Sequence, residues 1–366
     1  MTWPEVSLGD VCVFKYGKGL AAAARDGGQF DVYGSNGVVG LHSKALSRGP
    51  TIIIGRKGSF GEVKFSPASC WPIDTTYYVD ASATNADLNW LSYRLASLGL
   101  TGLNRAAAIP GLNRDDAYRK RLLLPPIDAQ RRIAAILDQA DALRAKRRQV
   151  FANLDALSQS IFHNMFSHEK ANATVAAVAR HIRTGPFGSQ LRHGEFVDEG
   201  VAVIGLDNVV SNEFCWSERR YITASKYDQL QRYTVQPSDV LISIMGTVGR
   251  CVVVPKGIPL AISTKHVCAI TPLEEQLDST FLRAAFLWHP DSRAHLLRQT
   301  KGSIMDGLNM GIIKAMPIPL PSLGRQLLLK AKLDLVGKST ASQRFAASIE
   351  DHLFASLQSR AFRGEL

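Results

Sequence analysis

The chain has 366 residues, of which 46% are hydrophobic and 20% are charged, and its formal net charge is +11. This length predicts two or three domains, and no apolar run approaches the ~20 residues that a membrane-spanning helix needs. The basic excess favours a polyanionic partner, nucleic acid first, although a generally basic protein without such a partner would have the same composition.

The amino terminus and the cysteines favour the cytoplasm. The first residues lack the charged and apolar pattern of a signal peptide. The five cysteines, Cys12, Cys70, Cys215, Cys251 and Cys268, form no Cys-x-x-Cys pair and no spacing suited to a metal. Scattered cysteines fit a reducing compartment in which thiols are buried as small hydrophobic groups. We therefore expect a cytoplasmic protein without a metal site or a membrane partner.

Residues 1–127 have the pattern of a mixed α/β domain. The β-branched residues 51–54 precede a Gly-x-x-Gly turn, which predicts a strand, a tight turn and a second strand over 62–65. The other predicted elements, in chain order, are a strand over 70–79, a helix over 89–98, a turn over 108–113 and a short strand over 122–127.

Residues 128–168 are predicted to form one very long helix. No proline or glycine occurs from 127 to 166, and a helix of that length spans roughly 57 Å. Apolar residues recur at alternating steps of three and four, the spacing of a heptad seam, which only Arg147 interrupts. The seam positions are Ile133, Ile136, Ala140, Leu143, Val150, Leu154, Leu157 and Ile161. A core helix has a similar period, but a helix this long needs a partner.

The segment 323–366 supplies that partner, because it also lacks proline and carries spaced apolar residues. These are Leu329, Leu333, Val336, Ala347, Leu353 and Leu357. We expect the two segments to pair as an antiparallel coiled coil, although each alone also fits a plain core helix.

Residues 169–322 repeat the order of the first half, so the chain is an internal duplication. The strand and glycine turn over 240–249 match 52–61, and 304–309 match 108–113. Gln326 matches Gln130 at the start of the long helices. The offset grows from 188 at the turn to 200 at the helix ends, so the second helix is about four residues longer, an insertion that locally unwinds a coiled coil. A duplicated unit of this kind predicts an approximate two-fold arrangement.

Motifs of catalysis are absent from the sequence. It has no P-loop, no dinucleotide fingerprint after a strand, no His-Glu-x-x-His and no Gly-x-Ser-x-Gly. A DNA amino-methyltransferase needs the tetrapeptide Asn/Asp/Ser-Pro-Pro-aromatic, which is also missing. Residues 124–127 have the two prolines but neither the polar residue before them nor the aromatic residue after them. We therefore interpret the chain as a binding protein rather than an enzyme, with no catalytic or metal-ligating residues.

Candidate DNA-binding residues lie on polar or glycine-rich segments, where backbone approaches phosphate and side chains reach base edges. Any one of them is equally typical of an ordinary surface charge, but many occupy equivalent places in both halves. In the first half they are Lys18, Arg25, Arg56, Lys57, Ser59, Asn104, Arg105, Asn113 and Arg114. In the second half they are Arg183, Ser189, Gln190, Arg192, His193, Thr247, Arg250, Lys265, Lys301, Ser303 and Asn309.

Taken in order, these segments resemble the specificity subunits of type I restriction–modification systems. The resemblance covers the whole chain and rests on the two-copy layout, the glycine turn of each half and the proline-rich lead into the helices at Gln130 and Gln326. It also rests on Thr184-Gly185-Pro186-Phe187-Gly188-Ser189-Gln190-Leu191 and on the closing Ala361-Phe362-Arg363-Gly364-Glu365-Leu366. The first half departs from the 184–191 pattern, because it has Tyr16-Gly17-Lys18-Gly19-Leu20 there.

The resemblance implies an α/β (α+β) chain with two similar globular target-recognition domains, separated by two long helices and related by a pseudo-two-fold internal repeat. Each domain would read one half of a bipartite site in double-stranded DNA. The helices would fix the unread spacer and dock two methyltransferase (modification) subunits, and restriction/translocase subunits would join. No cofactor is expected in this chain; S-adenosylmethionine, ATP and magnesium are expected on the partner subunits.

Two alternatives remain open from the sequence. A stand-alone coiled-coil DNA-binding protein would bind a bipartite site tightly without methyltransferase subunits. The specificity chain of a related type II restriction–modification enzyme would instead work with a fused nuclease–methyltransferase.

Overall fold

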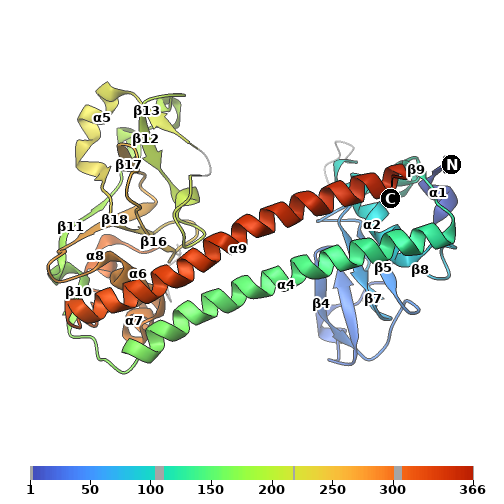
Figure 1. The fold of residues 1–366 in the computed structure, drawn as a ribbon, viewed down its shortest axis with the longest axis horizontal. Coiled ribbons are helices and arrows are strands. Elements are labelled where there is room, and N and C mark those ends of the chain that lie inside the picture. The colour runs from blue at the N-terminus through green and yellow to red at the C-terminus, as the bar shows by residue number, and fades with distance from the viewer. Residues whose placement is uncertain (1–2, 104–110, 217–218, 301–306, 366) are drawn as a thin grey trace. The chain divides into compact units, whose positions relative to one another are not determined.

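The computed structural model describes residues 3–103, 111–216, 219–300 and 307–365. The chain forms two compact units. Unit 1 comprises Met1–Gln149 and Arg344–Leu366, and unit 2 comprises Val150–Gln343. Each unit therefore combines one globular domain with one part of each long helix, α4 (Ile127–Phe166) and α9 (Leu323–Arg363) (Figure 1).

The globular domain of unit 1 contains two main sheets, with strand orders β2-β8-β5-β6 and β4-β3-β7. Its strands are β1 (Glu5–Ser7), β2 (Lys15–Tyr16), β3 (Phe30–Gly34), β4 (Gly37–His42), β5 (Thr51–Gly55), β6 (Val63–Ser66), β7 (Trp71–Pro72), β8 (Thr76–Asp80) and β9 (Arg121–Leu123). Its helices are α1 (Leu8–Val11), α2 (Leu88–Ser97) and α3 (Arg114–Tyr118). Ile52 and Ile54 of β5 pack into one core with Trp90 of α2, whereas Ile53 packs against Tyr33. The β-branched strand is therefore buried on both faces, as a continuous apolar run predicts.

Unit 2 repeats this design with sheets of order β11-β18-β15-β16 and β13-β12-β17-β14. Its strands are β10 (Ala173–Thr174), β11 (Ala179–Thr184), β12 (Val201–Ile204), β13 (Tyr221–Ile222), β14 (Thr234–Val235), β15 (Val240–Ser243), β16 (Cys251–Val253), β17 (Ala261–Ser263), β18 (Val267–Pro272) and β19 (Pro317–Ile318). Its helices are α5 (Ala224–Leu230), α6 (Ser279–Trp288), α7 (Pro290–Thr300) and α8 (Met310–Lys314). In each unit the second sheet holds one parallel pair, β3 with β7 and β12 with β17, so the predicted internal repeat is confirmed.

The glycine turn is the clearest repeated detail. In unit 1 the Gly61 amide donates to the Gly55 carbonyl at 2.8 Å, and in unit 2 the Gly249 amide donates to the Ser243 carbonyl at 3.0 Å. Gly61 and Gly249 have φ values of 75° and 83°, a left-handed backbone that side chains disfavour. Glycine at these two positions is therefore required by the turn itself.

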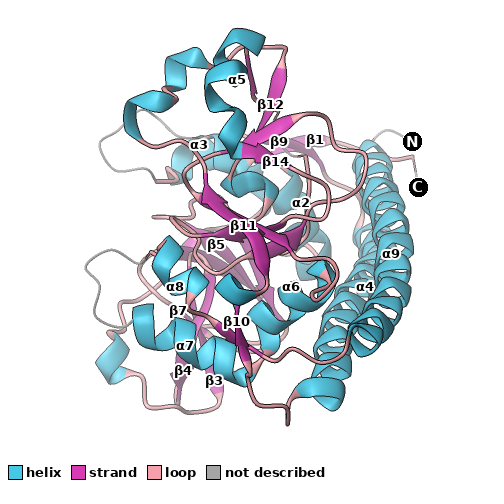
Figure 2. Ribbon diagram, turned by 90° about the vertical axis from the view of Figure 1, so that its left-hand side faces the viewer, coloured by secondary structure: helices cyan, strands magenta, loops and turns pink. Residues whose placement is uncertain are grey.

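The two long helices pair in an antiparallel sense within each unit. In unit 1, late residues of α9 meet early residues of α4, because Ala361 and Phe362 share a core with Ile133. In unit 2, Arg325 near the start of α9 lies 5.0 Å from the ring of Phe166 at the end of α4. Figures 1 and 2 show α4 and α9 side by side. The predicted antiparallel pairing is confirmed, while coiled-coil packing stays a prediction.

The predicted seam of α4 is wrong at three of its apolar positions. Leu143, Val150 and Leu157 are 58%, 36% and 47% exposed, and the positions one residue later are the better covered ones. Within unit 1, Arg144 takes the inner position because its Nε donates to Asp351 at 2.7 Å and its guanidinium lies 4.5 Å from the ring of Phe354. The aliphatic stem of an arginine covers apolar surface, so Arg144 takes the inner position and Leu143 stays exposed.

Arg147, which interrupts the predicted seam, lies in the helix pair of unit 1 and forms an ion pair with Glu350. Leu353 of α9 was also predicted to be buried, but it is 55% exposed. None of the described helices is both long enough and apolar enough to cross a bilayer.

Four of the five cysteines are buried, and burial raises the pKa of the Cys12, Cys251 and Cys268 thiols to about 12. Cys215 is exposed. The prediction of buried thiols is therefore wrong at Cys215, which lies in the irregular segment between β12 and β13 rather than on a strand.

A buried glutamine anchors the start of each long helix to the globular domain. Gln130 accepts a hydrogen bond from the Asp87 amide at 2.8 Å and donates one to the Pro125 carbonyl at 2.8 Å. Gln326 accepts from the Asp278 amide at 2.9 Å and donates to the Pro321 carbonyl at 2.9 Å. Asp87 and Asp278 are the N-caps of α2 and α6. The matched glutamines thus tie each long helix to the cap of a core helix.

We expect Gln130→Ala to destabilise unit 1 and Gln326→Ala to destabilise unit 2, each by about 1–3 kcal/mol, because buried partners lose their hydrogen bonds. Hydrogen-exchange mass spectrometry would show faster exchange at the start of α2 or α6, respectively. Gln139→Ala, on an exposed position of α4, is the matched control and should change neither unit. Equal effects of Gln130→Ala on both units would contradict the assignment.

Candidate nucleic-acid interface

In unit 1 two of the predicted DNA-binding residues, Arg56 and Arg114, contact the ring of the same tyrosine, Tyr16. Tyr16 ends β2, Arg56 follows β5 and Arg114 begins α3. The guanidinium carbons of Arg56 and Arg114 lie 5.4 Å and 5.5 Å from the centre of the Tyr16 ring, within range of a cation–π interaction. Tyr16 itself is 54% exposed. A clustered pair of guanidinium groups beside an exposed ring suits a nucleic-acid strand, which offers phosphates and base faces.

Contacts beneath the ring hold this cluster in place. Arg56 donates to the Asp74 carbonyl from Nε at 3.1 Å and from Nη2 at 2.5 Å. The Tyr16 ring packs on Tyr77 with 5.1 Å between centroids, and burial raises the pKa of Tyr77 to about 12. Tyr16 was not predicted from the sequence, although its place before Gly17 is equivalent to that of Thr184 before Gly185.

The other predicted residues of unit 1 have mixed environments. Lys18 and Lys57 are exposed on loops. Arg25 donates to the carbonyls of Val39 and Leu20, and Asn113 caps α3 by accepting from the amides of Asp115 and Asp116. These two side chains therefore stabilise local structure. Ser59 lies in the glycine turn, partly buried, and Asn104 and Arg105 lie outside the described residues.

Arg183 of unit 2 is held within the sheet. Its guanidinium donates to the Thr234 carbonyl, to Thr271 Oγ1 at 2.8 Å and to the fully buried carboxylate of Asp239 at 2.5 Å. This network uses the donors of Arg183 for the fold, since a buried carboxylate needs a charged partner. Arg183 as a DNA contact stays a prediction.

A loop that follows β11 carries four of the predicted residues of unit 2. Ser189, Gln190, Arg192 and His193 are exposed on it, and Gln190 accepts from the Tyr233 hydroxyl at 2.8 Å. The remaining predicted positions lie elsewhere in the unit: Thr247 and Arg250 belong to the glycine turn, Lys265 is exposed after β17, Asn309 caps α8 through the Ile312 amide, and Lys301 and Ser303 lie outside the described residues.

A glycine in each unit lets this loop approach the second sheet. A Cβ on Gly185 would lie 2.2 Å from the Ser263 carbonyl, and a Cβ on Gly17 would lie 2.1 Å from the Ile73 carbonyl. Such distances exclude any side chain without movement of the backbone. The loops after β2 and β11 are therefore placed in the same way, although their sequences differ.

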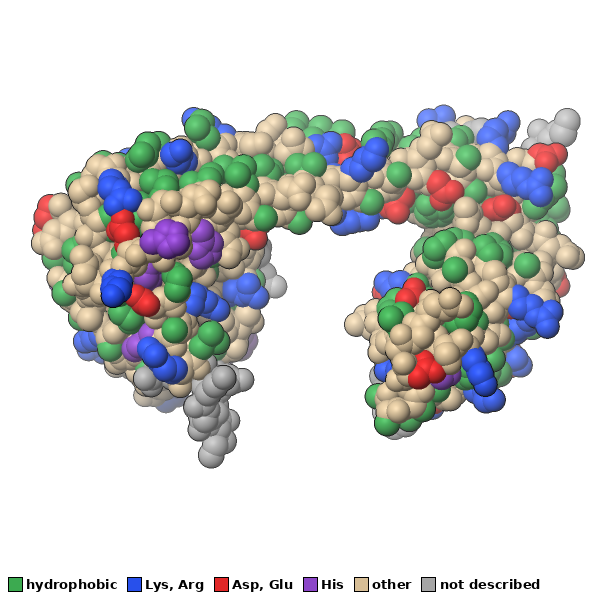
Figure 3. Space-filling view, turned by 90° about the horizontal axis from the view of Figure 1, so that it is seen from below, with side chains coloured by type: hydrophobic (Ala, Val, Ile, Leu, Met, Phe, Trp, Pro, Cys, Tyr) green, Lys and Arg blue, Asp and Glu red, His purple; other side chains and the backbone are tan. Residues whose placement is uncertain are grey.

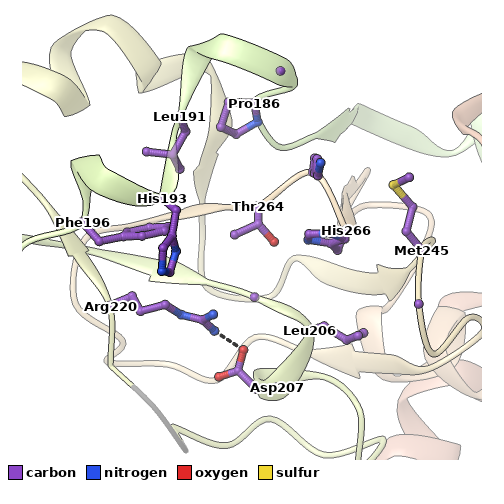
Figure 4. Close-up of a pocket in the computed structure, with 14 residues that line it drawn as sticks. Pro186, Leu191, His193, Phe196, Leu206, Asp207, Arg220, Met245, Thr264 and His266 are labelled. Carbon is purple, nitrogen blue, oxygen red and sulfur yellow. Dashed lines mark hydrogen bonds and ion pairs between the residues drawn. The ribbon is translucent and has the colours of Figure 1, made fainter.

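In unit 2 the loop after β11 forms one wall of an open cavity of about 650 Å³. This volume is in the range of small-molecule sites. Figure 4 shows His193, Arg220, Thr264 and His266 around it. Arg220 forms an ion pair with Asp207 on the cavity wall. Burial, followed by the charges of Lys265 and Arg220, lowers the pKa of His266. Among the described residues, no group of three His, Cys, Asp or Glu side chains is arranged to hold a metal ion.

Comparisons with known proteins bear on the first half of the chain and on the fold. Residues 1–150 match the family model described as the type I restriction modification DNA specificity domain. The chain is similar to the type I restriction enzyme EcoBI specificity subunit of Escherichia coli, with 26% identity over 183 residues, 47% of this chain. The match spans only 37% of that subunit's length.

Two solved structures are similar over nearly the whole chain. One is the S subunit of a type I restriction-modification system from M. genitalium, with a TM-score of 0.60, 15% identity and coverage of 99% of this chain and 96% of that one. The other comes from a study of complex assembly and conformational transition of the type I R-M system, with a TM-score of 0.54, 17% identity and coverage of 100% and 98%. At these identities the likeness concerns the fold.

Proposed function

We propose that this chain is a specificity subunit of a type I restriction–modification system, which recognises a DNA sequence on behalf of partner subunits that carry out the chemistry. The match of residues 1–150 to the family model and the similar fold of the solved S subunit support this proposal. The observation that carries the proposal is the repeated domain, in which basic residues from different loops gather beside the ends of the equivalent strands β2 and β11. Arg56 and Arg114 gather beside the end of β2 in unit 1, and His193, Arg220 and Lys265 gather beside the end of β11 in unit 2. Two similar readers in one chain suit a bipartite site in double-stranded DNA.

The long helices are proposed to set the spacer between the two half-sites. Each of α4 and α9 contributes residues to both units. A helix has a fixed rise of about 1.5 Å per residue, so its length is a stable measure of separation. One helical turn of B-DNA spans about 34–36 Å, and helices of this length have room for a spacer of that order.

Exposed apolar residues on the helices support docking of methyltransferase subunits. On α4 the row is Leu143, Val150 and Leu157, and on α9 Leu328 and Leu335 are 52% and 67% exposed. Within each row the residues are seven apart, the repeat that packs against another helix. Figure 3 shows hydrophobic side chains interspersed with basic ones along the long helices. Two methyltransferase subunits, which would supply S-adenosylmethionine, and restriction/translocase subunits with ATP and magnesium are the proposed partners.

The proposal predicts that damage to one domain changes one half-site only. The chain would be co-purified with its methyltransferase subunits, and methylated sites would be mapped by sequencing. Arg56→Ala with Arg114→Ala should relax the first half-site, and Gln190→Ala with Arg192→Ala the second, because a good base contact gives about 1–3 kcal/mol of discrimination. Arg119→Ala, an exposed arginine of unit 1 paired with Asp116 at 3.0 Å, is the control and should leave both half-sites unchanged.

Equal loss of both half-sites in either double variant would contradict this division of labour. Tight binding of the bipartite site by the purified chain alone, unaffected by methyltransferase subunits, would instead favour a stand-alone DNA-binding protein.

A further inference from the structure

The cavity of unit 2 contains polar residues that the proposed function has not yet used. Its walls come from the loop after β11, the end of β12, the residue before β13 and the segments after β15 and β17. Leu191, Phe196, Leu206 and Met245 supply apolar surface. Apolar surface with a few polar groups that fix the orientation of a ligand is typical of a binding site.

The charges around the cavity favour an acceptor-rich ligand. Two cationic side chains, Arg220 and Lys265, and two imidazoles, His193 and His266, line it against the one carboxylate of Asp207. Asp207 is engaged by Arg220. The described lining therefore offers mainly hydrogen-bond donors, and the hydroxyl of Thr264 adds one that has no partner among the described residues.

Arg220 differs from the other well-placed arginines of unit 2 in how the fold uses it. Arg183 donates to three groups of the sheet, and Arg283 donates to the carbonyls of Cys251 and Asn212. Arg220 donates to the Asp207 carboxylate from Nη2, and its side chain is 32% exposed. A guanidinium has five N–H donors, so Arg220 retains donors for a ligand.

Gly205 makes the placement of this pair possible. A Cβ at Gly205 would lie 2.7 Å from Nη2 of Arg220 and 2.8 Å from Oδ1 of Asp207. Any larger residue would displace the ion pair. An alanine at this position would shift the ends of both side chains, so the glycine leaves room for the Arg220–Asp207 pair as it stands.

We propose that this cavity reads a guanine in the half-site bound by unit 2, with Arg220 contacting the base and Asp207 holding the guanidinium in position. The inference rests on the proposed function and deepens it. Guanine presents two acceptors, N7 and O6, on its major-groove edge, and arginine is the side chain that matches them with two donors. Adenine and cytosine present amino donors there, for which the described lining holds no unengaged carboxylate.

The test uses the full chain in complex with its methyltransferase subunits and DNA duplexes that carry each of the four bases at every position of the second half-site. The wild type should prefer guanine at one position. Arg220→Ala and Arg220→Lys should reduce that preference at least ten-fold and leave every other position, and the first half-site, unchanged. Gly205→Ala should give the same defect without removing a charge.

Asp207 is tested as a positioning residue by a double-mutant cycle. Asp207→Asn should weaken selectivity at the same position as Arg220→Ala, and the double variant should be no worse than Arg220→Ala alone. Arg232→Ala, which removes an exposed arginine stacked on Tyr233 at 4.7 Å, is the matched control and should leave all base preferences as in the wild type.

Unchanged base preferences in a folded Arg220→Ala complex would overturn the inference, as would a uniform loss at all positions. If Arg220→Ala lowers the melting temperature, the base preferences of Arg220→Lys, which keeps the charge beside Asp207, are measured instead. A selective loss at the guanine position supports the inference, and unchanged preferences or a uniform loss overturn it. A wild-type complex without preference for any bipartite site would overturn the proposed function itself, a result distinct from a bipartite preference that survives in the Arg220 variants.

Discussion

Replacing Phe362 with alanine is expected to destabilise unit 1, the unit of the amino-terminal domain, by about 3–5 kcal/mol, because a buried aromatic ring leaves a cavity. Phe362 is at the end of α9, yet it shares a core with Trp90 and Ile133. The guanidinium of Arg94 lies 4.9 Å from the centre of its ring. The last turn of the chain is therefore part of the first domain's core.

Hydrogen-exchange mass spectrometry separates the effects on the two units. Phe362→Ala should raise exchange in α2 and leave unit 2 unchanged. Phe162→Ala, at the equivalent position, should do the reverse, because Phe162 is fully buried in unit 2 and lies 5.6 Å from Phe166 between ring centroids. Phe345→Ala, at a position 71% exposed on α9, is the control. Faster exchange in unit 2 alone after Phe362→Ala would contradict the antiparallel pairing.

The repeat, the long helices and the matched glutamines were predictable because each leaves a local signal. The glycine turns require left-handed backbone at Gly61 and Gly249, and such positions are marked in the sequence. Gln130 and Gln326 stand at fixed places after proline-rich leads and proved to make equivalent hydrogen bonds. A helix without proline or glycine is likewise visible in the sequence.

The register of the helix seam was only half predictable, because competing side chains decide it. Leu143 and Arg144 both fit a heptad position within one residue. The arginine lies inside because Asp351 and Phe354 of α9 offer it a carboxylate and a ring. Such a partner lies more than two hundred residues away, so period alone cannot identify it.

The basic character of the candidate site was predictable from the sequence, but the residues that make it up were not. Arg56 and Arg114 were predicted from their charge and their place on loops, and they do lie together. Tyr16, whose ring both of them contact, is uncharged and was therefore not predicted. Arg183 was predicted from its charge and proved to be engaged by Asp239. Arg220 and Asp207 were missed because the cavity forms only when five segments, separate in sequence, meet.

The proposed spacer role makes the second large prediction, which concerns helix length. Duplicating Leu143–Gln149 in α4 and Arg344–Glu350 in α9 adds seven residues to each helix beside the boundary of the two units. The duplication repeats the pairing of Arg147 with Glu350, and one heptad rotates a straight helix by only about 20°. The helices should therefore still pair, each longer by about 10 Å.

A longer helix pair should select a longer spacer and leave both half-sites unchanged. An extension of about 10 Å corresponds to about three base pairs at 3.4 Å each. Duplication in one helix alone is the control, and it should abolish methylation because the helices can no longer pair along their length.

Sequencing of the DNA methylated by the doubly extended chain with its methyltransferase subunits tests the account most directly. We expect the same two half-sites, separated by about three more base pairs, and loss of methylation at the original spacing. An unchanged spacer, or an altered half-site at the original spacing, would contradict the claim that two readers are held apart by the helices.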